Sequence, residues 1–248
     1  MENRRFSDDF IFGTRTVIEA IKAGRSIDKV LIRNGLSNDL FGELYQLIKE
    51  HDIAFQYVPQ EKLDRITRKN HQGVIAMMAA VDFHRLEDLL PGIWERGEAP
   101  LILILDQVTD VRNFGAIIRS AECAGVHAVV IPEKGAARVG DDAMKTSAGA
   151  LNLVPICRAA NLATVCNDLR TSGVKIVAAT EKGNVLYTRS EMSGPLAIIM
   201  GAEDTGISPA LLRMADELLQ IPILGQIGSL NVSVAASLMV YEALRQRN

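Results

Sequence analysis

The spacing of apolar residues between residues 10 and 81 changes repeatedly from the period of a helix to that of a strand. Helical spacing covers residues 14–23, 39–50 and 60–68, and extended patterns cover residues 29–32, 54–58 and 73–81. Helices and strands that alternate over so short a stretch predict a small α/β/α unit.

A second series of alternating elements begins at Leu101. The run Leu101–Leu105 is continuously apolar, which is typical of a strand buried on both faces of a parallel sheet. Further strands are predicted at residues 128–131, 153–157, 175–179, 196–200 and 217–223, and helices at residues 114–124, 141–149, 162–171, 209–214 and 231–247. This pattern predicts an α/β fold with a mostly parallel sheet covered by helices on both faces.

The segment between the two series is acidic and contains Pro91, Gly92, Gly97 and Pro100. Such breaks in periodicity favour an interdomain linker, with Trp94 anchoring it to one of the domains. The predicted organisation is therefore a domain at residues 1–81, a linker at residues 82–99 and a domain at residues 100–248.

Composition and charge limit the class of protein, its expected compartment and its possible partners. The chain is 48% hydrophobic, which is enough for a packed core, and no apolar run is long enough to span a bilayer. The three cysteines show no Cys-x-x-Cys spacing, and we expect reduced thiols in a cytoplasmic protein. The net charge of −3 gives no global electrostatic argument for binding to nucleic acid and counts mildly against an RNA partner.

A nucleic-acid contact must therefore come from a local basic patch. The densest patch contains Arg65, Arg68 and Lys69, and Arg4 and Arg5 are a possible extension of it. The alternative is a solvated helix end, where the helix dipole favours basic side chains. The sequence leaves both interpretations open.

Common nucleotide and metal sites do not fit the chain. The first buried strand is not followed by Gly-x-Gly-x-x-Gly, and Gly201–Gly206 has the glycine spacing of a phosphate loop without its lysine. Glu203 and Asp204 would also repel a triphosphate. Neither a His-x-x-x-His pair nor a nucleophile elbow is present, so we expect no metal site and no hydrolase triad.

Polar residues gather where predicted strands end and helices begin. They are Asn113, Arg119, Glu203, Ser229 and Asn231. Each has a structural alternative: Asn113, Ser229 and Asn231 are good helix caps, Arg119 is spaced to pair with Glu122, and Glu203 fits a solvated loop. The carboxyl ends of strands in an open α/β sheet also collect ligands, which makes the same residues candidates for an active site.

Three segments containing these residues resemble the three motifs of the SpoU (TrmH-type) branch of the SPOUT RNA ribose methyltransferases. They are Asn113–Ala121, Leu196–Gly206 and Ile221–Ala235, and they agree with the family in order and spacing over residues 100–248. The chain departs from the family pattern at Asp110-Val-Arg112, where Asp-Pro is expected, and at Phe114, where Leu is common.

The resemblance implies a catalytic domain with a C-terminal trefoil knot and an S-adenosyl-L-methionine cofactor. In the family, backbone groups of the knotted loops bind this cofactor, which corresponds here to Thr180, Gly201, Ile221 and Leu230. The resemblance also implies catalytic roles for Arg119, Asn113, Glu203, Ser229 and Asn231, with Glu203 and Asn231 fixing Arg119. Arg119 would act either as a general base or as a clamp for phosphate and the developing oxyanion.

Residues 10–81 resemble the L30e-like substrate-binding domain of the family members that modify ribosomal RNA. The resemblance implies 2'-O-methylation of a guanosine ribose in 23S ribosomal RNA, and a homodimer formed through helix 114–124 and the terminal helix. Two alternatives stay open at this point: a transfer-RNA 2'-O-methyltransferase, and a non-catalytic rRNA-binding or ribosome-assembly factor.

Overall fold

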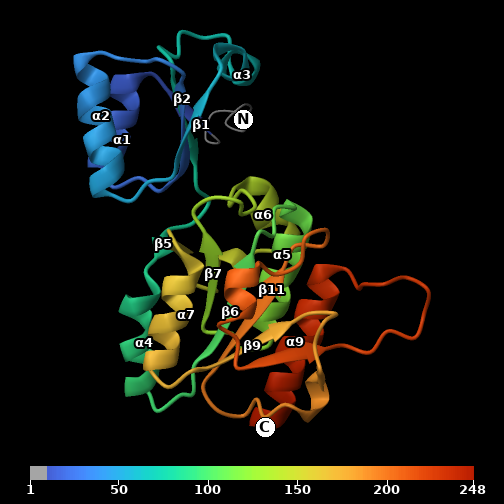
Figure 1. Cartoon of the computed structure of the whole chain (residues 1–248). Helices are drawn as coiled ribbons and strands as arrows, with labels where there is room; N and C mark the ends of the chain where they lie inside the picture. The colour runs from blue at the N-terminus through green and yellow to red at the C-terminus, as the bar shows by residue number, and fades with distance from the viewer. Residues whose placement is uncertain (1–9) are drawn as a thin grey trace, which may run out of the picture. The chain divides into compact units, whose positions relative to one another are not determined.

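A four-stranded sheet organises the N-terminal part of the computed structural model, which describes residues 10–248 (Figure 1). Its strands run in the order β1-β4-β2-β3, with β2 and β3 parallel and the other two pairs antiparallel. The strands are β1 (Phe10–Phe12), β2 (Ile27–Arg33), β3 (Phe55–Val58) and β4 (Val74–Met78), and the helices are α1 (Thr14–Lys22), α2 (Asp39–Glu50) and α3 (Gln60–Ile66).

Helices cover both faces of this small sheet. The apolar faces of α1 and α2 pack on one side, where Val17, Leu44 and Ile48 are buried against Val30. On the other side, Leu63 of α3 packs against the opposite face of the sheet. The predicted α/β/α arrangement is confirmed.

The C-terminal part contains an eight-stranded sheet in which every pair of neighbouring strands is parallel. The strand order is β10-β12-β9-β11-β6-β7-β8-β5. The strands are β5 (Phe83–His84), β6 (Leu101–Asp106), β7 (Ala128–Pro132), β8 (Ile156–Ala159), β9 (Lys175–Ala179), β10 (Val185–Leu186), β11 (Leu196–Gly201) and β12 (Glu217–Gln220). All six residues of β6 are buried, as expected for a central strand covered on both faces.

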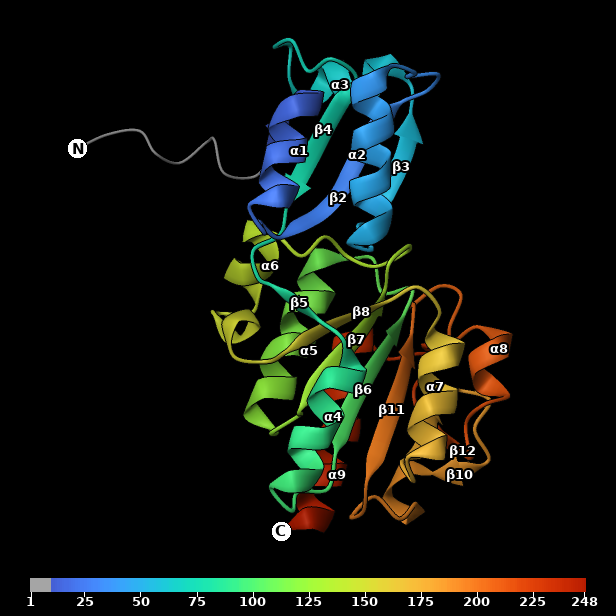
Figure 2. The ribbon, with the colours of Figure 1, turned by 90° about the vertical axis from the view of Figure 1, so that its left-hand side faces the viewer.

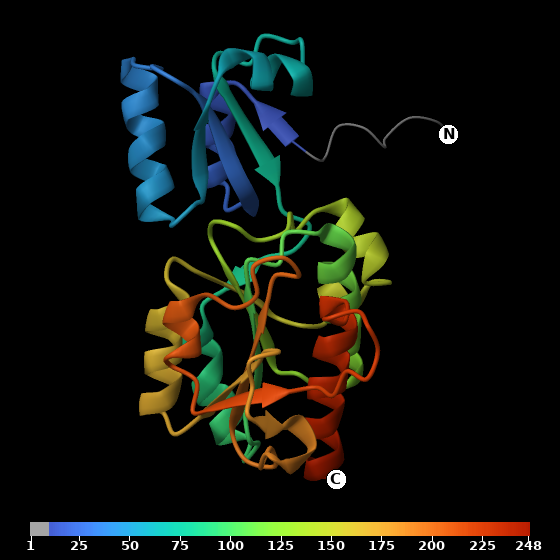
Figure 3. The same cartoon turned by 45° about the vertical axis from the view of Figure 1, so that its right-hand side comes forward.

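Two groups of helices cover this sheet (Figures 2 and 3). On one face α4, α7 and α8 bury their apolar side chains against β6 and its neighbours, and α5 and α9 lie on the other face. The helical segments are α4 (Leu86–Glu95), α5 (Val111–Cys123), α6 (Asp141–Thr146), α7 (Leu162–Thr171), α8 (Pro209–Leu212) and α9 (Val232–Arg247), with 3-10 turns η1 (Ala150–Asn152) and η2 (Tyr187–Arg189). The predicted mixed α/β class with a mostly parallel sheet is confirmed, while the knot stays a prediction.

Residues 82–99 differ from the expected linker. They form β5, which pairs with β8, and α4, in which Leu86, Leu90 and Ile93 are buried in the core beside the large sheet. The helix continues through Pro91 because burial of these side chains outweighs the hydrogen bond that proline cannot donate. The chain divides into two compact units, one ending at Asp82 but including Arg138–Asp141, the other formed by Phe83–Ala137 and Asp142–Asn248.

Within the region that the structure describes, no helix combines the length and apolar character needed to cross a membrane.

Gly115 allows α5 to pack closely against α6. A Cβ atom at this position would lie 1.9 Å from the Thr146 Oγ1 atom and 3.0 Å from the Ser147 backbone nitrogen. The space beside Gly115 is therefore filled by the chain itself, and is not open to a substrate or a second subunit.

We expect Gly115→Ala to lower the free energy of unfolding by about 1–3 kcal/mol, because the added methyl group must displace Thr146 and the backbone after it. Chemical denaturation measures the change. Gly92→Ala in α4 is the matched control, since its Cβ meets nothing closer than the Arg96 Nη1 atom at 3.7 Å. The control should be about 0.5–1 kcal/mol more stable than wild type. Equal effects of the two substitutions would contradict the close packing.

Candidate functional site

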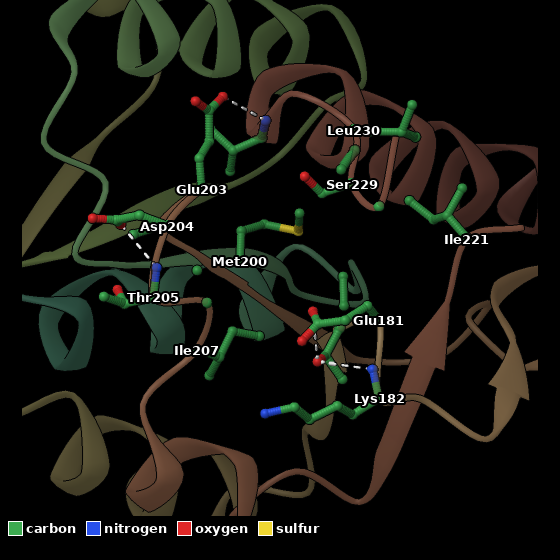
Figure 4. Close-up of a pocket in the computed structure, with 18 of the residues that line it drawn as sticks. Glu181, Lys182, Met200, Glu203, Asp204, Thr205, Ile207, Ile221, Ser229 and Leu230 are labelled. Atoms are coloured by element: carbon green, nitrogen blue, oxygen red, sulfur yellow. Dashed lines mark hydrogen bonds between the residues drawn. The ribbon is translucent and has the colours of Figure 1, made fainter. Parts of the chain in front are cut away.

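A cavity of about 320 Å³ opens at the carboxyl ends of β9, β11 and β12 (Figure 4). Because the three strands are parallel and adjacent, the turns that follow them meet at one edge of the sheet. The cavity is lined by residues 179–182 after β9, residues 200–207 at and after the end of β11, and residues 221, 223, 228–230, 232 and 235 between β12 and α9. Its volume lies within the range of small-molecule sites, about 300–1,000 Å³.

The backbone groups of residues 221–230, which form one wall of the cavity, are not hydrogen-bonded to the rest of the described chain. Across residues 10–248, no hydrogen bond joins this segment to any other part of the chain. The predicted strand at residues 217–223 ends at Gln220, which leaves Ile221 in the loop. The loop therefore presents backbone N–H and C=O groups, beside the apolar side chains of Ile221 and Leu230, to whatever enters the cavity.

The opposite wall is a tight turn that depends on glycine. A Cβ atom at Gly201 would lie 2.3 Å from the Ile207 backbone nitrogen, and Ala202 and Gly206 form a β-bridge. Gly206 has φ of +68°, a backbone conformation that L-residues with side chains rarely adopt. The turn closes on itself only without a side chain at position 201, because the backbone of Gly206 and Ile207 fills the space that a Cβ atom would need.

Glu203 connects this turn to the N-termini of α5 and α9. Its Oε1 atom accepts hydrogen bonds from the Asn113 side chain at 3.1 Å, the Asn231 side chain at 2.5 Å and the Val232 backbone N–H at 3.1 Å. Asn231 also donates to the Asn113 side chain at 2.9 Å. A carboxylate beside two helix N-termini is stabilised by both helix dipoles.

Asn231 and Asp110 are the residues that cap these helices. The Asn231 side chain accepts from the Ser233 backbone N–H, and the Asp110 side chain accepts from the Asn113 backbone N–H. The interpretation of Asn113 as a cap is wrong, because α5 begins at Val111 and places Asn113 in its first turn. The Asn113 side chain is therefore available to Glu203 and Asn231.

The structure brings most of the predicted site residues together. Thr180, Gly201, Ile221 and Leu230 all line the cavity, as do Glu203 and Ser229. Asn113 and Asn231 do not line the cavity, but both are hydrogen-bonded to Glu203, which does.

Arg119 lies apart from this group. It is exposed on α5, does not line the cavity, and has no hydrogen bond or ion pair within residues 10–248. The ion pair with Glu122 that its spacing suggested is not formed, and neither Glu203 nor Asn231 of the same chain fixes its guanidinium group.

Sequence reasoning missed Glu181 and Lys182, which line the cavity beside Thr180. The available signal was their position, since they directly follow a buried strand whose end was already assigned to the site.

The basic patch lies at the end of α3 in the other unit. Arg65, Arg68 and Lys69 are exposed, and Arg65 and Arg68 line a shallow hollow of about 570 Å³. The buried His71 fixes the turn that follows, because its Nδ1 atom accepts from the Gly73 backbone N–H and its Nε2 atom lies 2.9 Å from the Asp64 carboxylate. The hydrogen bond from His71 lowers the pKa of Asp64. Arg4 and Arg5 lie outside the described residues.

The described residues contain no group of three or more His, Cys, Asp or Glu side chains arranged to hold a metal ion. Burial raises the pKa of the Cys157 thiol to about 12 and that of Cys166 to about 11. Both cysteines therefore remain protonated thiols near neutral pH, as expected for packed core residues.

Two protein families match the chain in adjoining regions. The SpoU rRNA methylase family matches residues 100–241, and the family described as RNA 2'-O ribose methyltransferase substrate binding matches residues 10–83. A TrmH family tRNA/rRNA methyltransferase of Staphylococcus aureus (strain MSSA476) is 37% identical over 242 residues, which cover 97% of each chain. A Bacillus subtilis (strain 168) relative of the same description is 34% identical over 97% of this chain and 96% of its own.

Solved structures are similar over most of the chain or over about two thirds of it. An rRNA methyltransferase from Sinorhizobium meliloti with bound AdoMet is 27% identical, with a TM-score of 0.61, and the match covers 95% of this chain and 86% of that chain. The TrmH/SpoU tRNA modifying enzyme of A. aeolicus is 31% identical, with a TM-score of 0.56, over 65% of this chain and 84% of that chain.

Glu203→Ala should lower the free energy of unfolding by about 1–3 kcal/mol, because three donors at two helix N-termini lose their shared acceptor. Thermal or chemical denaturation measures this loss. Asp204→Ala is the matched control, since the Asp204 carboxylate accepts only from the adjacent Thr205 backbone N–H within residues 10–248. A control that loses as much stability as Glu203→Ala would contradict the anchoring role of Glu203.

Proposed function

Because the chain belongs to the SpoU family of RNA methyltransferases, we propose that it methylates the 2'-hydroxyl of a guanosine ribose in 23S ribosomal RNA. The predicted family and enzyme class are confirmed by the match over residues 100–241 and by relatives that span nearly the whole chain. The RNA class, the nucleotide and the roles of single residues belong to the proposal.

The cofactor is S-adenosyl-L-methionine, and the cavity suits it. When bound, it supplies an electrophilic methyl group on a sulfonium centre. An adenosine group has flat apolar faces and polar edges, and the loop at residues 221–230 offers both apolar side chains and free backbone groups. In this proposal Thr180, Gly201, Ile221 and Leu230 hold the nucleoside, largely through their backbone. The solved rRNA methyltransferase from Sinorhizobium meliloti with bound AdoMet supports the assignment.

Asn113, Glu203, Ser229 and Asn231 then form the catalytic side of the cavity. A neutral hydroxyl is a poor nucleophile, so the enzyme must hold the ribose oxygen in line with the methyl group while its proton leaves. The hydrogen bonds of Glu203 hold Asn113 and Asn231 in place, and the Ser229 side chain is free to contact the sugar.

We assign Arg119 to the substrate phosphate and to the negative charge that develops on oxygen. A guanidinium group keeps its proton throughout the physiological pH range, which makes it a better clamp than a general base. Because Arg119 is exposed and unpaired within residues 10–248, it is available to the cavity of a second subunit.

A homodimer is part of the proposal. Exposed apolar side chains gather on α9 and next to α5, where Leu153, Val234 and Tyr241 are 69%, 48% and 47% exposed. The other side of α9 is already buried against α5 and the sheet. A helix with apolar residues on both faces is usually buried on both faces. A second subunit related by a two-fold axis would cover the exposed face of α9.

The N-terminal unit favours ribosomal RNA over transfer RNA. It matches a substrate-binding family and carries the basic patch at Arg65, Arg68 and Lys69, which we assign to RNA phosphates. The similarity to the rRNA methyltransferase covers 95% of the chain, whereas the similarity to the tRNA modifying enzyme covers 65%. The single observation that carries the choice is the presence of this unit.

Incubation of the protein with methyl-labelled cofactor and separate pools of 23S rRNA, 16S rRNA and tRNA tests the proposal. We expect label in 23S rRNA, recovered as 2'-O-methylguanosine after digestion and mass spectrometry. Label in tRNA would establish the alternative substrate, and absence of label from every pool would favour a non-catalytic assembly factor.

The Arg119→Lys variant tests whether methyl transfer depends on the guanidinium group of Arg119. It keeps the positive charge but loses the planar fork, so we expect a loss of turnover of about 100-fold or more with unchanged cofactor binding. Turnover near the wild-type value would exclude any need for the guanidinium group.

A further inference from the structure

Within residues 10–248, four charged side chains line the cavity, and one of these four is a cation. They are Glu181, Lys182, Glu203 and Asp204. Each carboxylate accepts a hydrogen bond: Glu203 from three donors, Asp204 from the Thr205 backbone N–H, and Glu181 from the Thr180 hydroxyl at 3.3 Å. The Lys182 ammonium group has no partner within residues 10–248.

The backbone of Lys182 is held at a fixed position beside the cavity. Its N–H donates to the Thr180 hydroxyl at 3.3 Å, and the Gly183 N–H donates to the Thr180 carbonyl at 3.0 Å. Gly183 lies directly on β12, because a Cβ atom there would come within 2.5 Å of the Leu219 carbonyl carbon. The turn after β9 is thus fixed at both ends, and the Lys182 side chain extends from it along the side of the cavity below Met200 and Ile207 (Figure 4).

Two of the three charged groups of the cofactor are complementary to the carboxylates of the cavity, and the carboxylate group of the cofactor is the exception. The sulfonium and the α-ammonium groups of S-adenosyl-L-methionine suit a cavity with three carboxylates, but its carboxylate group would be repelled by them. The loop at residues 221–230 offers neutral dipoles only. Among the described residues that line the cavity, Lys182 is the only one whose side chain can compensate the charge of a bound carboxylate.

We propose that Lys182 binds the carboxylate of the methionine moiety and thereby orients the cofactor, with its amino-acid end toward the turn at residues 180–183. This inference rests on the proposed cofactor site and adds to it a contact made by a charged side chain, where the other contacts are made by backbone. Lys182 is a positioning residue, since it touches the cofactor away from the methyl group that is transferred.

Calorimetric titration of the full-length protein with two ligands tests this assignment. S-adenosylhomocysteine carries the amino-acid carboxylate, and 5'-methylthioadenosine lacks it but keeps the nucleoside and the sulfur. We expect Lys182→Met to weaken S-adenosylhomocysteine binding by about five- to tenfold, as for a partly solvated ion pair, and to leave 5'-methylthioadenosine binding unchanged.

Two further variants make the result specific. Lys182→Arg keeps the charge and should restore most of the affinity for S-adenosylhomocysteine, and Lys134→Met, at an exposed lysine outside the cavity, should bind both ligands as the wild type does. Equal weakening of both ligands by Lys182→Met, or no change in either, would overturn the inference. If the wild type bound neither ligand, the proposed cofactor site itself would be overturned. That result is distinguishable from a failure of the Lys182 assignment alone.

Discussion

The carboxylate of Glu203 is the interaction on which the shape of the site depends. It holds the first turns of α5 and α9 through Asn113, Asn231 and the Val232 backbone N–H, although these residues are far apart in the sequence. The loop at residues 221–230 runs from β12 into the anchored start of α9. It is therefore fixed at its two ends while its own backbone groups stay free, and a binding wall needs both properties.

Neutral backbone groups and charged side chains lie in different parts of the cavity. Neutral backbone groups and the side chains of Ile221 and Leu230 form one wall, and the charged side chains lie in the turns after β9 and β11. Arg119 is outside the cavity of its own chain. In the proposed function this cavity holds the cofactor and a guanidinium group acts on the substrate, so that group would come from the second subunit of the proposed dimer.

Much of the fold could be predicted from the sequence, because the periodicity of buried positions is a local property. The bounds of α2, α7 and β9 agree with the prediction. The resemblance to the SpoU family grouped Thr180, Gly201 and Ile221, and these residues line one cavity because the parallel strands before them end at one edge of the sheet. Features that depend on distant partners were not predictable in this way. Pro91 and Gly92 indicated a break where buried leucines maintain α4, Asn113 resembled a cap although Asp110 has that role, and the fit of Gly115 depends on Thr146.

Amide hydrogen exchange with and without S-adenosylhomocysteine tests the central claim most directly, since it reports on the loop at residues 221–230 one segment at a time. The account predicts fast exchange in this loop for the free protein, because its N–H groups have no partner within residues 10–248, and marked protection when the ligand is bound. The segment around Arg65 and Arg68 should not change. Bound ligand, verified by calorimetry, with no protection of residues 221–230 would contradict the account.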